Sequence, residues 1–96
     1  MINLREEYLA ELRVIFTNYC PHAEIWAYGG RVKNDCNAGS DLDLTVKSFN
    51  EEGKSLAELK QLLNDSNITI LIDINEYSTL PQSFRQEIDR LHERIF

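Results

Sequence analysis

The chain has 96 residues, of which 43% are hydrophobic and 27% are charged, and this balance is typical of one folded domain over residues 1–96. Its net charge of −6 disfavours partners such as nucleic acid or an anionic membrane, because both are bound through basic surfaces. No stretch approaches the roughly 20 apolar residues of a membrane span, and the first residues, MINLREEYLAEL, lack the apolar run of a signal peptide. We therefore expect a cytoplasmic protein.

The first half of the chain predicts a helix, a strand and a second, shorter helix. Apolar residues recur at helical spacing as far as Cys20, and Pro21 then ends the pattern. The next apolar run stops at the pair Gly29-Gly30, which punctuates regular structure. The expected elements, in chain order, are a helix at 3–20, a strand at 23–28, a short helical turn from 31 and a loop at 37–39.

The second half predicts two strands, each followed by a helix. Residues 41–47 and 68–75 alternate between apolar and polar side chains, as half-buried strands do. Ser55 and Glu58 have the spacing of a capping box, which marks the start of a helix. The expected elements are a strand at 41–47, a helix from 55 that ends before 64, a strand at 68–75 and a helix at 83–94. This order predicts a small sheet flanked by helices, of class α/β or α+β, with the strand directions left open.

Three aspartates are the candidate catalytic residues. Asp41 and Asp43 alternate along one strand, so both project from one face of it, about 6–7 Å apart. Asp73 is the charged residue in the middle of the isoleucine-rich strand. If these strands are neighbours, three carboxylates converge and repel one another, and Mg²⁺ removes that conflict. Two Mg²⁺ ions would suit phosphoryl or nucleotidyl transfer.

The Gly29-Gly30 pair is the candidate phosphate-binding turn. A strand that ends in two glycines and enters a helix offers unobstructed backbone N–H groups to phosphate. Arg31 and Ser40 are possible further phosphate donors. A plain tight turn, an exposed arginine and a serine that merely starts a strand are the alternatives to these roles.

These residues resemble a known family. Gly29-Gly30, ten residues and then Asp41-Leu42-Asp43-Leu44 match the G-[GS]-x10-D-x-D pattern of the DNA polymerase beta-like nucleotidyltransferase superfamily. The short length and the later ILIDIN strand are most similar to its minimal nucleotidyltransferases. The resemblance implies a mixed sheet with helices, metal binding by Asp41, Asp43 and Asp73, and nucleotide binding by the two glycines. A departure is Gly30, where the commonest minimal form has serine.

The resemblance also implies a function. It predicts an enzyme that moves a nucleoside monophosphate from ATP or another NTP to a hydroxyl group, with two Mg²⁺ ions as cofactors. Family members often act as antitoxins on a separate helical protein of the HEPN class, which they adenylylate. The alternative is an antitoxin module that binds nucleotide and neutralises its partner by contact, with little or no catalysis.

The remaining candidate residues have plainer interpretations. Cys20 and Cys36 lack metal-ligand spacing, and we expect two free thiols rather than a disulfide. Trp26 and Tyr28 could stack on a nucleobase, but packing in the core is the expectation for both. We expect His92 on the surface, and the apolar stripe of the last helix in the core.

Overall fold

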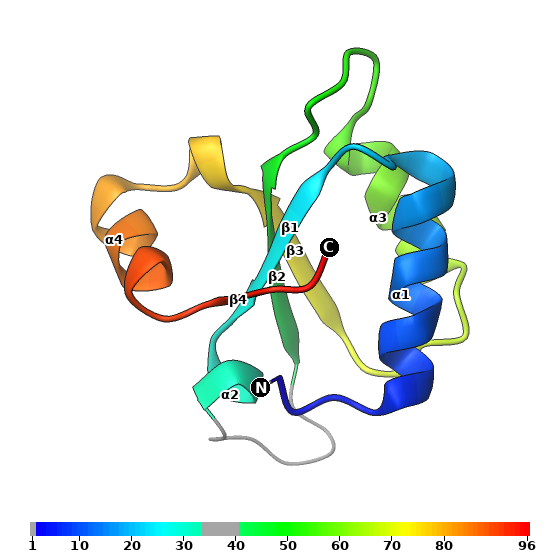
Figure 1. Ribbon diagram of the computed structural model, residues 1–96, viewed down its shortest axis with the longest axis horizontal. Coiled ribbons are helices and arrows are strands. Elements are labelled where there is room, and N and C mark those ends of the chain that lie inside the picture. Colours follow the sequence, from blue (N-terminus) through cyan, green and yellow to red (C-terminus); the bar gives the residue numbers. More distant parts are fainter. Residues whose placement is uncertain (1, 34–40) are drawn as a thin grey trace.

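The computed structural model describes residues 2–33 and 41–96, which form a four-stranded sheet between helices (Figure 1). No helix in this part of the chain has the length and apolar character needed to cross a membrane. The elements are α1 (Glu6–Tyr19), β1 (Glu24–Tyr28), α2 (Gly30–Lys33), β2 (Leu42–Ser48), α3 (Leu56–Asn64), β3 (Ile72–Glu76), the 3-10 turn η1 (Tyr77–Thr79), α4 (Gln82–Arg90) and β4 (Glu93–Arg94).

The sheet has the strand order β3-β2-β1-β4 and mixed strand directions. Strand β1 runs antiparallel to both β2 and β4, whereas β2 and β3 are parallel. Helix α3 makes the crossover that a parallel pair requires. The expected mixed sheet flanked by helices is therefore confirmed, and the strand directions that the sequence left open are now defined.

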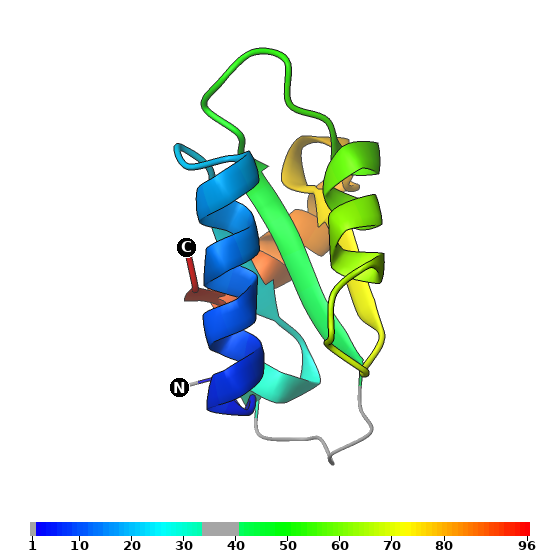
Figure 2. The ribbon, with the colours of Figure 1, turned by 90° about the vertical axis from the view of Figure 1, so that its right-hand side faces the viewer.

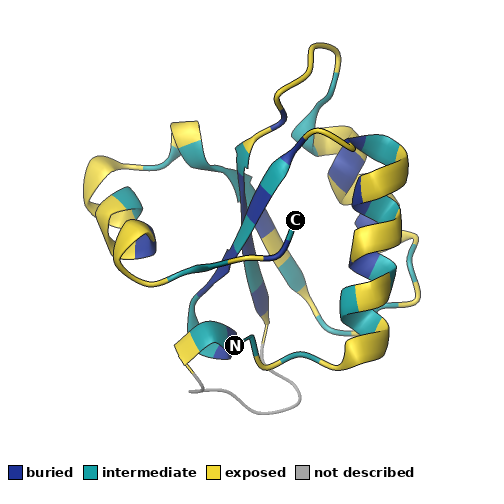
Figure 3. Ribbon diagram, viewed as in Figure 1, coloured by how far each residue is buried: buried dark blue, intermediate teal, exposed yellow. Residues whose placement is uncertain are grey.

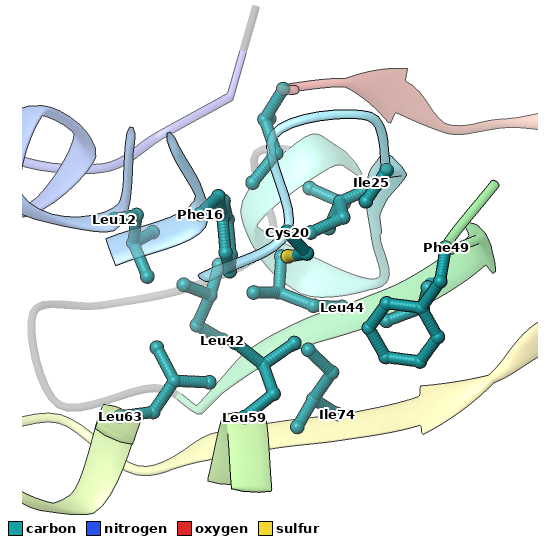
Figure 4. Close-up of a cluster of buried hydrophobic side chains, with 14 residues drawn as sticks. Leu12, Phe16, Cys20, Ile25, Leu42, Leu44, Phe49, Leu59, Leu63 and Ile74 are labelled. Atoms are coloured by element: carbon teal, nitrogen blue, oxygen red, sulfur yellow. The ribbon is translucent and has the colours of Figure 1, made fainter. Parts of the chain in front are cut away.

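Helices α1 and α3 lie side by side on one face of the sheet and bury the apolar residues of its strands (Figures 2 and 4). Several of these residues have no exposed surface at all: Leu12, Phe16, Cys20, Ile25, Ala27, Leu42, Leu44 and Leu59. Cys20 is a free thiol, and its burial raises its pKa to about 11. Cys36 lies outside the described residues.

The start of α3 confirms the predicted cap. The backbone N–H of Glu58 donates to Ser55 Oγ at 3.1 Å, which satisfies one of the free donors of the first turn. The backbone N–H of Ser55 donates to the hydroxyl of Tyr19 at 2.8 Å, so the end of α1 is tied to the start of α3. This bond helps to hold the two helices as one layer.

The predicted strand at 68–75 is too long at its beginning. Its alternation is real, because Ile68, Ile70 and Ile72 are half-buried, whereas Thr69 and Leu71 are exposed. Pairing nevertheless begins only at Ile72, opposite Leu42 at the start of β2. Within the described chain, β2 therefore offers residues 68–71 little to pair with beyond one hydrogen bond from the N–H of Leu42 to the carbonyl of Leu71, at 2.8 Å.

The predicted helix at 83–94 is wrong in its second half. Helix α4 ends at Arg90, Leu91 is extended, and residues 93–94 form β4 beside β1. The backbone N–H of Ile95 donates to the carbonyl of Ile25 at 2.9 Å, and this pairing outweighs the helical periodicity of the segment. The apolar stripe is therefore not continuous core: Ile88 is buried, but Phe84 and Leu91 are 42% and 44% exposed (Figure 3).

Candidate active site

The second face of the sheet lies on the side of α4 (Figure 1). Polar residues are in register on it across three strands. Tyr28 of β1 pairs with Asp43 of β2, and Asp43 pairs with Asp73 of β3. In the next row, Thr45 of β2 pairs with Asn75 of β3. Because residues two apart share a face, Asp43 and Thr45 point to the same side of the sheet, and the leucines beside them point to the core.

A cavity of about 270 Å³ lies over the first of these rows. The sheet side contributes Tyr28, Asp43 and Asp73, together with the turn after β1. Helix α4 forms the opposite wall with apolar side chains and one carboxylate. The lining residues are Tyr28, Gly29, Lys33, Asp43, Asp73, Phe84, Glu87, Ile88 and Leu91.

Negative charge dominates this cavity. Among the described residues that line it, three are carboxylates and Lys33 is the one cation. Burial raises the pKa of Asp43, and the charges of Asp73 and then Asp41 raise it further. The site therefore disfavours the ionised form of Asp43 and favours the arrival of a cation.

Gly29 leads from β1 into the cavity wall in a conformation that other residues rarely adopt. Its φ is +78°, in the left-handed region that favours glycine. A Cβ atom at this position would collide with the Asp43 carboxylate and would lie 3.2 Å from its Cγ atom. Residue 29 must therefore be glycine for the turn and the carboxylate to occupy their places together.

The other residues that the sequence singled out are less central. Asp41 is exposed and does not line the cavity, although its charge acts on Asp43. Gly30 is the first residue of α2. Arg31 is 5% exposed and donates from Nη1 to the carbonyl of Asn3 at 2.8 Å, so its side chain supports the N-terminal segment and is absent from the cavity lining. Ser40 and the expected loop at 37–39 lie outside the described residues.

Sequence reasoning missed the contribution of α4 to the site. Glu87 adds a carboxylate and Phe84 an exposed ring, although that stripe predicted core. Their spacing with buried Ile88 places all three on one side of α4, but nothing in the sequence indicates that this side faces a cavity. Lys33 also lines the cavity, and its position one turn after Gly29 was the available signal.

The site fits Mg²⁺ that is shared with a ligand. No group of three or more His, Cys, Asp or Glu side chains within residues 2–33 and 41–96 is spaced to hold a metal ion by itself. Mg²⁺ is, however, commonly held by one or two carboxylates, with substrate phosphates and water as its other ligands. Asp43 and Asp73, paired on neighbouring strands, supply such a donor set.

The tyrosine of this site is packed and hydrogen-bonded. Tyr28 is 8% exposed, its ring meets Phe84 edge-on at 5.8 Å between centroids, and its oxygen accepts a bond from Asn75 Nδ2 at 2.9 Å. Burial raises the pKa of Tyr28, so the phenol remains protonated at neutral pH. Asn75 Oδ1 in turn accepts a bond from Thr45 Oγ1 at 2.7 Å.

Trp26 packs away from the cavity. Its ring stacks on His92 with 3.8 Å between centroids, and its Nε1 donates to Glu24 at 2.7 Å. Trp26 is half-buried, does not line the cavity and is not part of the hydrophobic core, so it packs outside the core where core packing was expected. His92 is half-buried as well, which corrects the expectation of a surface residue.

The chain is similar to known proteins both in sequence and in fold. No family model matches the chain. The Haemophilus influenzae protein named "Probable protein adenylyltransferase MntA" is 30% identical over 93 residues, which cover 95% of this chain and 81% of that protein. A structure provisionally described as a minimal nucleotidyltransferase is 25% identical, with a TM-score of 0.68 over 91% of each chain. A crystal structure of a toxin–antitoxin with AMP-PNP shares the fold, at 16% identity and a TM-score of 0.70, over 92% of this chain and 72% of that one.

Proposed function

Since the chain belongs to the minimal nucleotidyltransferase family that includes MntA, we propose that it transfers a nucleoside monophosphate, AMP from ATP, to a hydroxyl group of a partner protein. One observation carries the proposal. Asp43 and Asp73 lie side by side on neighbouring parallel strands, and both line a cavity that Gly29 lines as well. Carboxylates in this arrangement suit the binding of Mg²⁺ and nucleotide together.

In the proposed reaction, the hydroxyl oxygen of the acceptor attacks the α-phosphorus of ATP. The bond from that phosphorus to the bridging oxygen breaks, pyrophosphate leaves, and the hydroxyl proton is released. Asp43 and Asp73 would hold Mg²⁺, with Asp41 as a further ligand, and the bound metal supplies charge neutralisation at the phosphates. Gly29 and Lys33 line the cavity, so the turn that begins at Gly29-Gly30 would receive the triphosphate and Lys33 would offer it a positive charge.

The acceptor is proposed to be a separate helical protein of the HEPN class. The similar protein from Haemophilus influenzae is named a protein adenylyltransferase, and a neighbour in fold is a toxin–antitoxin. The net charge of −6 supports a protein acceptor over a polynucleotide, because RNA and DNA need a basic surface.

The proposal is tested by incubating the purified protein with α-labelled ATP, MgCl2 and the proteins encoded beside it. Label on one partner, at a Tyr, Ser or Thr identified by mass spectrometry, is the expected result. The label should disappear with Asp43→Asn and when EDTA replaces MgCl2. Parallel reactions with GTP, CTP and UTP measure the preference for the base.

Two outcomes would count against transfer to a protein. Neutralisation of the partner without any transfer of label would favour the contact-only antitoxin. Label on tRNA or on a small molecule, in the absence of any partner, would keep the reaction class and replace the acceptor.

A further inference from the structure

We propose that Tyr28 is a nucleotide-binding residue whose phenolic O–H donates to a phosphate oxygen in the cavity, and that Thr45 and Asn75 fix the direction of this donation. The inference rests on the proposed function, since it assigns Tyr28 a place in the same site. It begins from the polarity of three linked side chains: Thr45 donates to Asn75, and Asn75 donates to Tyr28.

Asn75 links Thr45 to Tyr28 through the two ends of its amide. An asparagine amide has an accepting oxygen and a donating nitrogen, and the two ends of Asn75 have different partners. Its Oδ1 lies 2.7 Å from the hydroxyl of Thr45, a residue with no exposed surface. That bond turns Nδ2 toward the oxygen of Tyr28, at 2.9 Å.

The phenol of Tyr28 is an acceptor toward Asn75. Its oxygen accepts a hydrogen from Asn75, so the phenolic hydrogen needs an acceptor elsewhere. Within residues 2–33 and 41–96 no protein acceptor is bonded to it, and Tyr28 lines the cavity. A buried donor that opens onto a cavity is satisfied by a ligand that brings its own acceptors, and phosphate oxygens are such acceptors.

The neighbours of Tyr28 belong to the proposed metal and phosphate site. Tyr28 pairs with Asp43 in the sheet, and Gly29 follows it directly in the chain. Tyr28 therefore neighbours the carboxylate proposed to hold Mg²⁺ and the turn proposed to accommodate the triphosphate, and the charges of Asp43 and Asp73 both help to raise the pKa of its phenol. The edge-on contact with Phe84 of α4 fixes the ring on its other side.

The test compares Tyr28→Phe with a matched control, Tyr77→Phe. Both variants lose only a hydroxyl, but the hydroxyl of Tyr77 donates to Asp89 and Tyr77 does not line the cavity. Calorimetry measures the affinity for AMP-PNP in MgCl2, and thermal melting measures the response to MgCl2 alone. We expect Tyr28→Phe to weaken AMP-PNP binding about tenfold, as for the loss of a hydrogen bond to a charged group. The response to MgCl2 alone, and the affinity of Tyr77→Phe, should match the wild type.

Each other outcome is decisive. Equal AMP-PNP affinity in Tyr28→Phe and the wild type would overturn the inference and leave the proposed function intact. A variant that loses the response to MgCl2 as well has a disturbed carboxylate pair, and the assigned donor role would then be wrong. A wild-type protein that binds no AMP-PNP in MgCl2 would remove the proposed function and this inference with it.

A second pair of variants tests the direction of donation and covers a failure of Tyr28→Phe to fold. In Thr45→Val the amide of Asn75 is free to turn its oxygen toward Tyr28 and draw the phenolic hydrogen out of the cavity. Thr45→Ser keeps the hydroxyl that donates to the amide oxygen of Asn75. Weaker AMP-PNP binding in Thr45→Val than in Thr45→Ser is the expected result, and equal binding in the two would exclude the role of Thr45.

Discussion

The two faces of strand β2 differ sharply, although their residues alternate along one short segment. On the face toward α1 and α3, Leu42 and Leu44 have no exposed surface and contribute to the core. On the other face, Asp43 and Thr45 point toward a cavity and a hydrogen-bonded row. The apolar face supplies the burial that stabilises the fold, and the polar face carries charges that oppose each other. One face of β2 can retain carboxylates that lower the stability of the fold, because the other face supplies the packing that stabilises it.

Removing the charge of Asp43 while keeping its shape should have the largest effect. Asp43→Asn should lower nucleotidyl transfer by about 100-fold or more, as the loss of one electrostatic group at a reaction centre does. The fold should survive, because the substitution touches no core residue. Circular dichroism checks the fold and labelled ATP measures transfer, with Asp65→Asn at the end of α3 as the control for charge. Near wild-type transfer by Asp43→Asn would remove Asp43 from the site.

The opposite face should respond to truncation in stability. Leu44→Ala removes a fully buried side chain, so the free energy of unfolding should fall by about 2–5 kcal/mol. Leu71→Ala is the matched control, because Leu71 is 73% exposed and its truncation should change stability by less than about 0.5 kcal/mol. Urea unfolding measures both. Equal losses would mean that β2 does not pack as described.

Gly29 and Gly53 share a backbone conformation but differ in what surrounds them. Their φ values are +78° and +82°, so alanine should strain both by about 1–3 kcal/mol. A Cβ at residue 53 meets nothing within 4 Å, whereas one at residue 29 meets Asp43. We expect Gly29→Ala to lose AMP-PNP binding as well as stability, and Gly53→Ala to lose stability only. Binding by Gly29→Ala at wild-type affinity would show that Asp43 can move aside freely.

Much of this organisation could be predicted from local patterns. Alternation along β2 assigned Asp43 to a face, and the capping residues located the start of α3. The spacing from Gly29 to Asp43 matched the pattern of the nucleotidyltransferase superfamily, and that resemblance implied a shared site. The face of β2 and the cap of α3 were predicted correctly because their causes lie within a few neighbouring residues.

The parts that could not be predicted depend on contacts between distant segments. Nothing local distinguishes a longer last helix from a helix followed by β4, because the decisive partner of Ile95 is Ile25. Arg31 lies beside a glycine pair and was therefore a candidate phosphate donor. Its side chain instead donates to the backbone carbonyl of Asn3, near the start of the chain. Likewise, the place of Glu87 in the cavity wall could be predicted only from the position of α4 over the sheet.

The smallest expected effect concerns the pH dependence of stability, which should distinguish the two faces without any ligand. The pKa of Asp43 is raised above its ordinary value of 3.8, chiefly by burial and then by Asp73. Below that value both folded and unfolded chains hold the proton, so the residue contributes no pH dependence. As pH rises through the interval between the unfolded and the folded pKa, the unfolded chain releases the proton first, and stability falls. Above the folded pKa the loss is complete.

Asp43→Asn should therefore have a higher Tm than the wild type at neutral pH, and the difference should shrink as pH falls toward 3.8. Melting curves from pH 3.5 to 7.5 without divalent ions measure it. Addition of MgCl2 with AMP-PNP should then raise the Tm of the wild type more than that of the variant, because ligand binds the folded state through this carboxylate. A difference between the two proteins that stays constant with pH would mean that Asp43 is not strained by its surroundings, and the contrast between the two faces of β2 would lose its electrostatic basis.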